Sequence, residues 1–294
     1  LVERGRLGGT CTNDGCVPTR VLAHAARLMR ETAQHDAYGL LGPRPQLDFA
    51  RLMSRAQQVV YTVHEKKQML KHLDSSGVTA YVGAGNARFV DDHHIQVPRP
   101  EGVAAVLGAE HFVIATGSRP YHPPDIDFSH PRILDSDSVL RLGHTPRSIT
   151  IYGAGVIGCE YASIFANLDV KVNLVDTRDR LLSFLDDEIT DALSYHLRHQ
   201  GVVIRHDEAY AAVAANEDGV VLHCQSGKKF KTDLLLWANG RSGNTTDLGL
   251  EEIGLTPNRR GQLDVNASYQ TALPHICLLY TSDAADEEDS VDLG

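Results

Sequence analysis

The fold of this chain is decided by one stretch, which runs Ser148-Ile-Thr-Ile-Tyr-Gly153-Ala-Gly155-Val-Ile-Gly158-Cys-Glu160-Tyr-Ala-Ser-Ile-Phe-Ala-Asn-Leu-Asp-Val-Lys-Val-Asn-Leu-Val-Asp176. It opens with a short apolar run, residues 149–152, which is typical of a buried parallel strand. After a glycine turn, residues 156–168 have apolar side chains at helical spacing. Residues 170–175 form a second apolar run, which ends at an acidic residue. This order of elements predicts a βαβ unit and an α/β fold.

The three glycines of the turn have the spacing of a dinucleotide-binding fingerprint. Gly153 permits the tight turn, Gly155 lets the backbone approach a pyrophosphate, and Gly158 lets the helix pack closely on the strand. The helix that begins at Val156 and Ile157 presents unpaired N–H groups and a positive dipole to the phosphates. We therefore predict a dinucleotide site. A glycine turn in an ordinary α/β unit is the alternative.

Asp176 stands at the end of the second strand, where a carboxylate accepts hydrogen bonds from an adenosine ribose. The 2′-phosphate of NADP would meet like charge there, which favours NAD. Arg178 and Arg180 follow in the same loop, and either guanidinium could bind that phosphate. The alternative is that both arginines are solvated surface residues. We expect the domain to bind both nucleotides and to prefer NAD(H).

The composition is that of a soluble globular protein with about two domains. The chain has 294 residues, 42% hydrophobic and 22% charged, and a net charge of −10. No basic stripe suggests nucleic acid, and no apolar run is long enough to span a membrane. Five cysteines without a secretory context do not indicate a disulfide scaffold, so we expect a cytoplasmic protein.

A second informative stretch is Gly8-Gly-Thr-Cys11-Thr-Asn-Asp-Gly-Cys16-Val-Pro-Thr-Arg20. Helical spacing over residues 17–30 places both cysteines at or just before a helix N-terminus, where the dipole lowers the pKa of a thiol. This indicates a redox-active disulfide, with two buried structural thiols as the alternative. Because no second Cys/His pair follows at ligand spacing, we expect no metal centre.

This motif resembles the active-site signature of the FAD-dependent pyridine nucleotide–disulfide oxidoreductases, which include dihydrolipoamide dehydrogenase and mercuric reductase. The resemblance implies that Cys11 exchanges with substrate and that Cys16 contacts the flavin. It also implies an ion pair near the flavin between Arg20, which stands where the family usually has Lys, and Glu160. The candidate catalytic residues are therefore Cys11, Cys16, Arg20 and Glu160.

The same resemblance implies an FAD site. Glu3 matches the acid that binds the adenosine ribose, and Ala115-Thr116-Gly117 matches the motif that closes the FAD domain. The glycine fingerprint of that domain is missing, so we expect a chain that begins late and retains FAD weakly. The candidate cofactor-binding residues are Glu3, Gly9, Thr10, Thr116, Gly117, Gly153, Gly155, Val156, Ile157, Gly158, Asp176, Arg178, Gly240 and Arg241.

Within this family, roughly residues 80–276 resemble the soluble pyridine nucleotide transhydrogenases. The segments that carry the resemblance are residues 84–91, 117–122, 130–133, 135–138, 152–165, 177–185, 226–229 and 269–272 and Asn239-Gly240-Arg241. It implies an FAD enzyme that passes hydride between NADPH and NAD. Those transhydrogenases lack the second cysteine, so an NAD(P)H-dependent disulfide reductase that uses both thiols is an alternative. An inactive, truncated nucleotide-binding module is a third.

The predicted fold is α/β with two Rossmann-like FAD/NAD(P)-binding domains, truncated at both ends. Helical spacing predicts one helix over residues 47–73. The partners are small-molecule nucleotides, and we expect the full-length form to be a homo-oligomer. The predicted parts are an incomplete FAD-binding domain (1–120), a linker (121–147), an NAD(P)-binding domain (148–265), a return to the FAD domain (266–276) and an acidic, disordered tail outside the family pattern (277–294).

Overall fold

The computed structural model describes residues 1–33, 38–39, 42–43, 45–99 and 102–279. The chain divides into two compact units. The first unit comprises Leu1–Asn13, Val63–Arg119 and Arg241–Gly294, and the second comprises Asp14–Thr62 and Pro120–Gly240. Among the described residues, no helix is both long and apolar enough to cross a bilayer.

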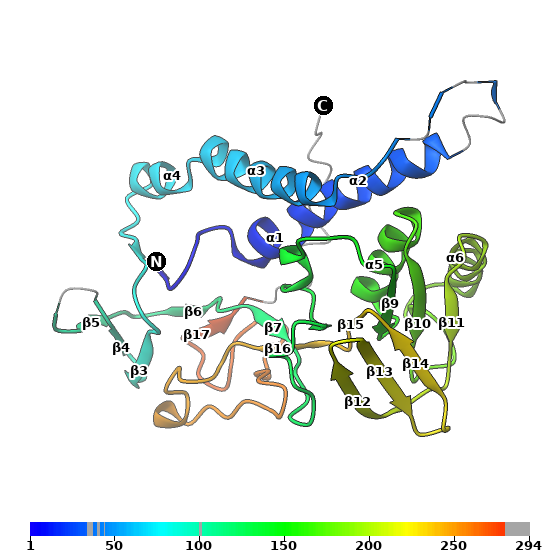
Figure 1. Cartoon of the computed structure of the whole chain (residues 1–294). Helices are drawn as coiled ribbons and strands as arrows, with labels where there is room; N and C mark the ends of the chain where they lie inside the picture. The colour runs from blue at the N-terminus through cyan, green and yellow to red at the C-terminus, as the bar shows by residue number, and fades with distance from the viewer. Residues whose placement is uncertain (34–37, 40–41, 44, 100–101, 280–294) are drawn as a thin grey trace. The chain divides into compact units, whose positions relative to one another are not determined.

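The second unit is built on a five-stranded parallel sheet with the order β11-β10-β9-β15-β8 (Figure 1). Its strands are β8 (Ile133–Leu134), β9 (Ser148–Tyr152), β10 (Lys171–Val175), β11 (Val203–Arg205) and β15 (Leu234–Trp237). Ile149, Ile151 and Leu235 have no exposed surface, as expected for strands that are covered on both faces. The predicted βαβ unit is confirmed, because α5 (Val156–Asn167) connects the paired strands β9 and β10.

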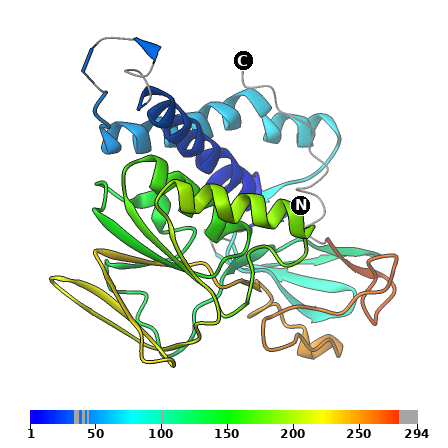
Figure 2. The same ribbon diagram turned by 90° about the vertical axis from the view of Figure 1, so that its right-hand side faces the viewer.

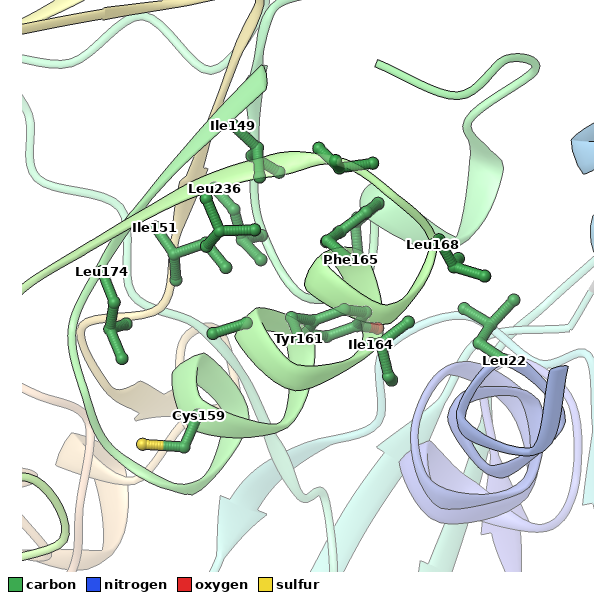
Figure 3. Close-up of a cluster of buried hydrophobic side chains, with 14 of the residues drawn as sticks. Leu22, Ile149, Ile151, Cys159, Tyr161, Ile164, Phe165, Leu168, Leu174 and Leu236 are labelled. Carbon is green, nitrogen blue, oxygen red and sulfur yellow. The ribbon is translucent and has the colours of Figure 1, made fainter. Parts of the chain in front are cut away.

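Apolar side chains of this unit's helices belong to the same core cluster as side chains of the sheet. The helices are α2 (Cys16–Thr32), residues 49–62 of α3 (Phe49–Lys67), α5 and α6 (Asp187–His199), the yellow-green helix in front of the strands in Figure 2. Figure 3 shows Tyr161, Ile164 and Phe165 of α5 in one cluster with strand residues and with Leu22 of α2. Burying each such side chain contributes roughly 1.5–3 kcal/mol, so this cluster fixes α5 against the sheet.

An antiparallel sheet completes the second unit. Its strands are β12 (Tyr210–Asn216), β13 (Gly219–Cys224) and β14 (Lys229–Thr232). A smaller core lies beside it, in which the rings of Tyr152 and Trp237 stack with their centroids 4.5 Å apart. The predicted linker, residues 121–147, supplies the buried strand β8 and the 3-10 turn η2 (Val139–Arg141). That part of the linker is therefore an element of this unit, because β8 pairs with β15.

The first unit consists of short strands and helices around its own core. Phe89, Ile114, Leu250 and Ile276 are among the buried residues of that core. Its elements are β1 (Val2–Glu3), β2 (Tyr81–Val82), β3 (Arg88–Asp91), β4 (His94–Val97), β5 (Ala105–Gly108), β6 (Phe112–Ile114), residues 118–119 of β7 (Ser118–Pro120), β16 (Arg241–Gly243), β17 (Ile276–Leu278), residues 9–13 of α1 (Gly9–Asp14), residues 63–67 of α3, α4 (Met69–Ser75) and η3 (Glu251–Ile253). Within the described part, β3, β4 and β5 form one antiparallel sheet, whereas β1 with β2 and β6 with β17 form parallel pairs.

Two sequence predictions need correction here. The predicted tail was to begin at residue 277, but β17 pairs with β6 through residue 278, and Leu279 N donates to Ile114 O at 3.0 Å. Ile276 is fully buried, and the backbone pairing that follows it extends the folded chain past residue 276, where the composition had placed its end. The rest of the predicted tail, residues 280–294, lies outside the described residues.

The second correction concerns the helix predicted over residues 47–73. It is divided into α3 and α4 by Gln68, whose φ of 41° is left-handed and interrupts a right-handed helix. Apolar periodicity continues across the interruption, so it could not reveal the break. The two compact units group residues by packing, and the division into FAD- and NAD(P)-binding domains stays a prediction.

Candidate nucleotide-binding site

Two glycines of the β9–α5 turn are required by backbone packing. Gly153 has a φ of 110°, and a Cβ atom there would lie 2.6 Å from Ala238 O, just beyond β15. A Cβ atom on Gly158 would lie 1.8 Å from Gly153 O. Real Cβ atoms do not approach oxygen so closely, so both positions exclude a side chain. Gly158 is therefore the residue that lets the start of α5 lie against the turn.

Gly155 differs, because no described residue lies closer to the space beside it than ordinary van der Waals contact. A Cβ atom there would find Arg178 Nη2 as its nearest neighbour, at 3.9 Å. Gly155 precedes α5, whose first residue Val156 is 60% exposed. The N–H groups of Val156, Ile157 and Gly158 belong to the first helical turn, where no carbonyl of the helix itself can accept them. Open space beside N–H donors fits an anionic group such as a pyrophosphate.

Asp176 holds this turn in place. It is 4% exposed, and its carboxylate accepts hydrogen bonds from the backbone N–H of Ala154 and from that of Arg178 at 2.9 Å. Arg178 Nη2 also forms a salt bridge with it at 3.2 Å. Burial raises the pKa of the Asp176 carboxyl, but the hydrogen bonds from Arg178 and Ala154 outweigh burial and hold this pKa below its usual value. The residue is therefore ionised at neutral pH.

The two arginines of the next loop have different partners. The Arg178 side chain is 43% exposed and contacts Asp176. Its guanidinium therefore lies beside the turn and is accessible to a nucleotide phosphate. Arg180 instead pairs with Asp187 at the start of α6, and its Nε lies 3.8 Å from Asp179. Of the two arginines considered from the sequence, only Arg178 is thus held beside Gly155 and Asp176.

The carboxyl ends of β9, β10 and β15 meet at the same edge of the sheet. Ala238 N donates to Tyr152 O at 2.8 Å, and Gly153 N donates to Val175 O at 2.8 Å. The strand order reverses between β9 and β15, and such switch points are where open α/β sheets bind ligands. Gly240, with a φ of 90°, follows β15 and is the last residue of the second unit.

The predicted FAD residues lie in the first unit. Glu3 ends β1, and its carboxylate accepts a hydrogen bond from Gly5 N at 2.7 Å. Thr116 and Gly117 follow β6; Thr116 is exposed, and no protein atom lies within 4 Å of a Cβ built on Gly117. Asn244, which sequence reasoning missed, fixes this turn by donating through Nδ2 to Thr116 O and through its backbone N to Gly117 O, both at 3.0 Å.

Arg241 is also placed in the first unit. Its Nε donates to Ser118 Oγ and its Nη2 donates to Ser118 O, both at 2.8 Å. The guanidinium therefore ties β16 to β7. Gly240 and Arg241, predicted together as cofactor-binding residues, thus fall in different units.

The cysteine motif forms two helices. Gly9, Thr10 and Cys11 lie in α1, whereas Cys16 is the first residue of α2 and is exposed. Neither sulfur is in a disulfide bond. Sequence reasoning missed Asn13, whose Nδ2 donates to Leu7 O at 3.1 Å and to Gly9 O at 2.8 Å. The Asn13 side chain also contacts His64 Nε2 at 2.8 Å, so it anchors the segment from Leu7 to Gly9 at the start of α1.

A family model described as "Pyridine nucleotide-disulphide oxidoreductase" matches residues 1–279. The chain belongs to this family. Members of the family use FAD together with NAD(H) or NADP(H). The matched residues end at Leu279, which directly follows β17.

Several curated relatives are soluble pyridine nucleotide transhydrogenases, among them those of Shigella flexneri and Escherichia coli (strain K12 / DH10B). Each is 50% identical over 277 residues, which is 94% of this chain and 59% of the relative. The chain thus spans about three fifths of the length of these relatives. The HOCl-induced flavoprotein disulfide reductase RclA from Escherichia coli has a similar structure, with a TM-score of 0.79, 29% identity, and coverage of 95% of this chain and 59% of RclA. LpdA from Mycobacterium tuberculosis, at 23% identity and a TM-score of 0.84, shares the fold.

The ion pair that the family resemblance implied is not formed among the described residues. Arg20 lies exposed on α2 and Glu160 lies exposed on α5, and these helices pack on each other. The salt bridges among described residues do not include an Arg20–Glu160 pair. Desolvation raises the pKa of the Glu160 carboxyl group. The packed helices are held by apolar contacts instead, which fix the helices without orienting two long charged side chains.

The remaining thiols of the second unit behave as structural residues. Burial raises the pKa of Cys159 to about 12 and that of Cys224 to about 11. Cys159 Sγ donates to Ala154 O at 3.5 Å within the apolar cluster. These two thiols are therefore protonated at neutral pH.

Proposed function

We propose that the protein is an FAD-dependent oxidoreductase that transfers hydride between NADPH and NAD. The observation that supports this most strongly is the 50% identity, over 94% of the chain, with soluble pyridine nucleotide transhydrogenases. The open glycine turn beside Asp176 agrees with a nicotinamide nucleotide as ligand. Since the chain spans 59% of those relatives, the activity is proposed for the protein that contains this chain.

Each group of residues has a defined task in this proposal. Gly155 and the N–H groups of Val156 and Ile157 bind the pyrophosphate of the nicotinamide nucleotide. Asp176 orients the adenosine ribose, and Arg178 moves toward a 2′-phosphate when NADP(H) is bound. Because Asp176 is fixed whereas Arg178 must be reordered, the site prefers NAD(H).

The first unit supplies the candidate residues for FAD. In this proposal Glu3, the last residue of β1, and Thr116 and Gly117, which follow β6, bind FAD, since none of the three is buried. When bound, FAD supplies the two-electron chemistry that connects the two nicotinamide nucleotides. The protein is proposed to act in the cytoplasm as a homo-oligomer on small-molecule nucleotides.

A second candidate function is NAD(P)H-dependent reduction of a disulfide. It rests on Cys16, which is exposed at the N-terminus of α2, and on the family's pairing of such a thiol with one at the position of Cys11. RclA, a structural relative, is named a flavoprotein disulfide reductase. In this reaction one NAD(P)H and one proton convert a substrate disulfide into two thiols.

The two candidates differ in what reoxidises the reduced protein. The FAD-loaded protein is bleached anaerobically with one equivalent of NADPH, and its flavin absorbance is then followed after addition of NAD or of a small disulfide. We expect NAD to restore the absorbance and the disulfide to leave it bleached. Restoration by the disulfide alone would establish the second candidate. A protein that binds no FAD would be the inactive nucleotide-binding module.

A further inference from the structure

Three side chains with metal-binding groups meet at one edge of the first unit. Asp92 and His93 form the turn between β3 and β4, and His275 immediately precedes β17. One ligand atom from each of the three lies within 4.8 Å of the other two. The two imidazole rings stack with centroids 4.5 Å apart and planes at 17°. The nucleotide turn lies in the second unit, so this cluster is separate from it.

Backbone carbonyls orient both imidazoles. His93 Nδ1 lies 3.0 Å from Ala109 O, and His275 Nε2 lies 2.9 Å from Asp92 O. A carbonyl can only accept, so each of these nitrogens carries the proton, and the other ring nitrogen keeps its lone pair. Histidines that bind metals are commonly held in this way, with the second nitrogen donating to a backbone carbonyl. The carbonyls thus fix which nitrogen of each ring is free to bind an ion, and one of the two stacked rings must turn for both lone pairs to meet at one ion.

The neighbouring pair Asp91 and His94 is arranged differently. His94 Nδ1 lies 2.8 Å from Asp91 Oδ1, and His93 N donates to that same oxygen at 2.9 Å. The Asp91 carboxylate is therefore occupied within the hairpin. Asp92, by contrast, is exposed, and no described residue donates a hydrogen bond to its carboxylate. Of the four neighbouring residues 91–94, two acids and two histidines, only Asp92 and His93 belong to the cluster with His275.

We propose that Asp92, His93 and His275 bind one divalent first-row transition cation, for which Zn²⁺ is the representative. His93 Nε2, His275 Nδ1 and one Asp92 carboxylate oxygen are the protein ligands, and water fills the remaining position. Imidazole and carboxylate suit this class of ion, whereas Ca²⁺ and Mg²⁺ prefer oxygen ligands alone. The ion joins the β3–β4 hairpin to the start of β17, across 183 residues of sequence. Because it binds the folded state, it stabilises the first unit.

The test is a Zn²⁺ titration of the chelator-treated 294-residue chain, followed by calorimetry and by thermal unfolding. We expect one site per chain and a Tm that rises with the Zn²⁺ concentration. His93→Gln and His275→Gln should each weaken binding by at least about tenfold and abolish the rise in Tm. His94→Gln is the matched control, since it removes an adjacent imidazole outside the cluster, and it should bind as the unmutated chain does.

A further variant and a second metal ion test the same site independently of whether the histidine variants fold. Asp92→Asn retains the shape of the turn, so it replaces either histidine variant if that variant does not fold, and it too should weaken binding. Co²⁺ in place of Zn²⁺ should give visible absorption bands that both His→Gln variants lose. Equal Zn²⁺ affinity in the control and the cluster variants, or a loss of affinity in His94→Gln alone, would overturn the proposal.

Discussion

At the scale of single residues, the three glycines of the β9–α5 turn serve different purposes. Gly153 and Gly158 avoid collisions with the backbone, at 2.6 Å and 1.8 Å for an added Cβ atom. At Gly155 an added Cβ atom would collide with nothing described, since its nearest neighbour would be 3.9 Å away. Packing within the protein therefore does not explain its lack of a side chain, which agrees with the pyrophosphate site that we propose. The sequence motif predicts a separate role for each glycine, and the close contacts at Gly153 and Gly158 agree with the tight turn and the helix packing expected there.

This difference predicts opposite effects of two alanine variants. Gly158→Ala should lower the free energy of unfolding by about 1–3 kcal/mol, because the start of α5 must move away from the turn. Gly155→Ala should change it by less than about 1 kcal/mol, yet weaken the binding of NADH. Urea unfolding and an NADH titration of the same two proteins measure both effects. Equal destabilisation by the two substitutions would show that Gly155 is also a packing residue.

Asp176 predicts a pH dependence of stability. Its pKa is lower in the folded state than the ordinary value of about 3.9, so it stabilises the fold above that pH and loses this contribution as the pH falls through the folded-state pKa. Asp176→Asn should therefore cost about 1–3 kcal/mol at pH 7, since the buried Ala154 N–H loses a charged acceptor.

The measurement is the difference in unfolding free energy between the Asp176→Asn variant and the unmutated chain, in urea at pH 7 and at successively lower pH. That difference should shrink once the pH falls below about 4. A difference that is the same at every pH would mean that ionisation of Asp176 does not stabilise the turn.

At the scale of elements, the apolar pattern predicted the βαβ unit, because its two short strands are almost continuously apolar and its helix has apolar residues at helical spacing. It missed the break at Gln68, since a left-handed residue leaves no trace in an apolar pattern. It also placed the end of the ordered chain too early. β17 has only three residues, and its stability comes from pairing with β6, which is far away in sequence.

The role of β17 can be tested with two adjacent substitutions. Ile276 has no exposed surface and belongs to the core of the first unit, so Ile276→Ala should cost about 2–5 kcal/mol. Cys277 is half-buried on the same strand, and Cys277→Ala should cost less than about 1 kcal/mol. Thermal unfolding of both variants is the measurement. If the two substitutions lowered the stability by comparable amounts, burial of Ile276 in the core would not be what stabilises this strand.

At the scale of the whole molecule, the positions of local motifs were predictable from the sequence, whereas contacts between residues far apart in the sequence were not. The sequence placed Asp176 at the end of its strand and Cys16 at the start of its helix correctly. It did not reveal that Asn244 fixes the turn at Thr116, nor that His275 meets the hairpin at His93. These contacts join residues far apart in sequence, and no periodicity connects them. The predicted Arg20–Glu160 pair failed because apolar packing between α2 and α5 does not require it.

The most direct test of the central claim is the rate at which the FAD-loaded protein reduces thio-NAD with NADPH, measured with and without its two motif thiols. The account predicts that Cys11→Ser combined with Cys16→Ser leaves this rate within about twofold of the original, because hydride passes between nucleotides without a disulfide. A rate that falls by about tenfold or more in a variant that still binds FAD would contradict the account, since electrons would then have to pass through the thiols.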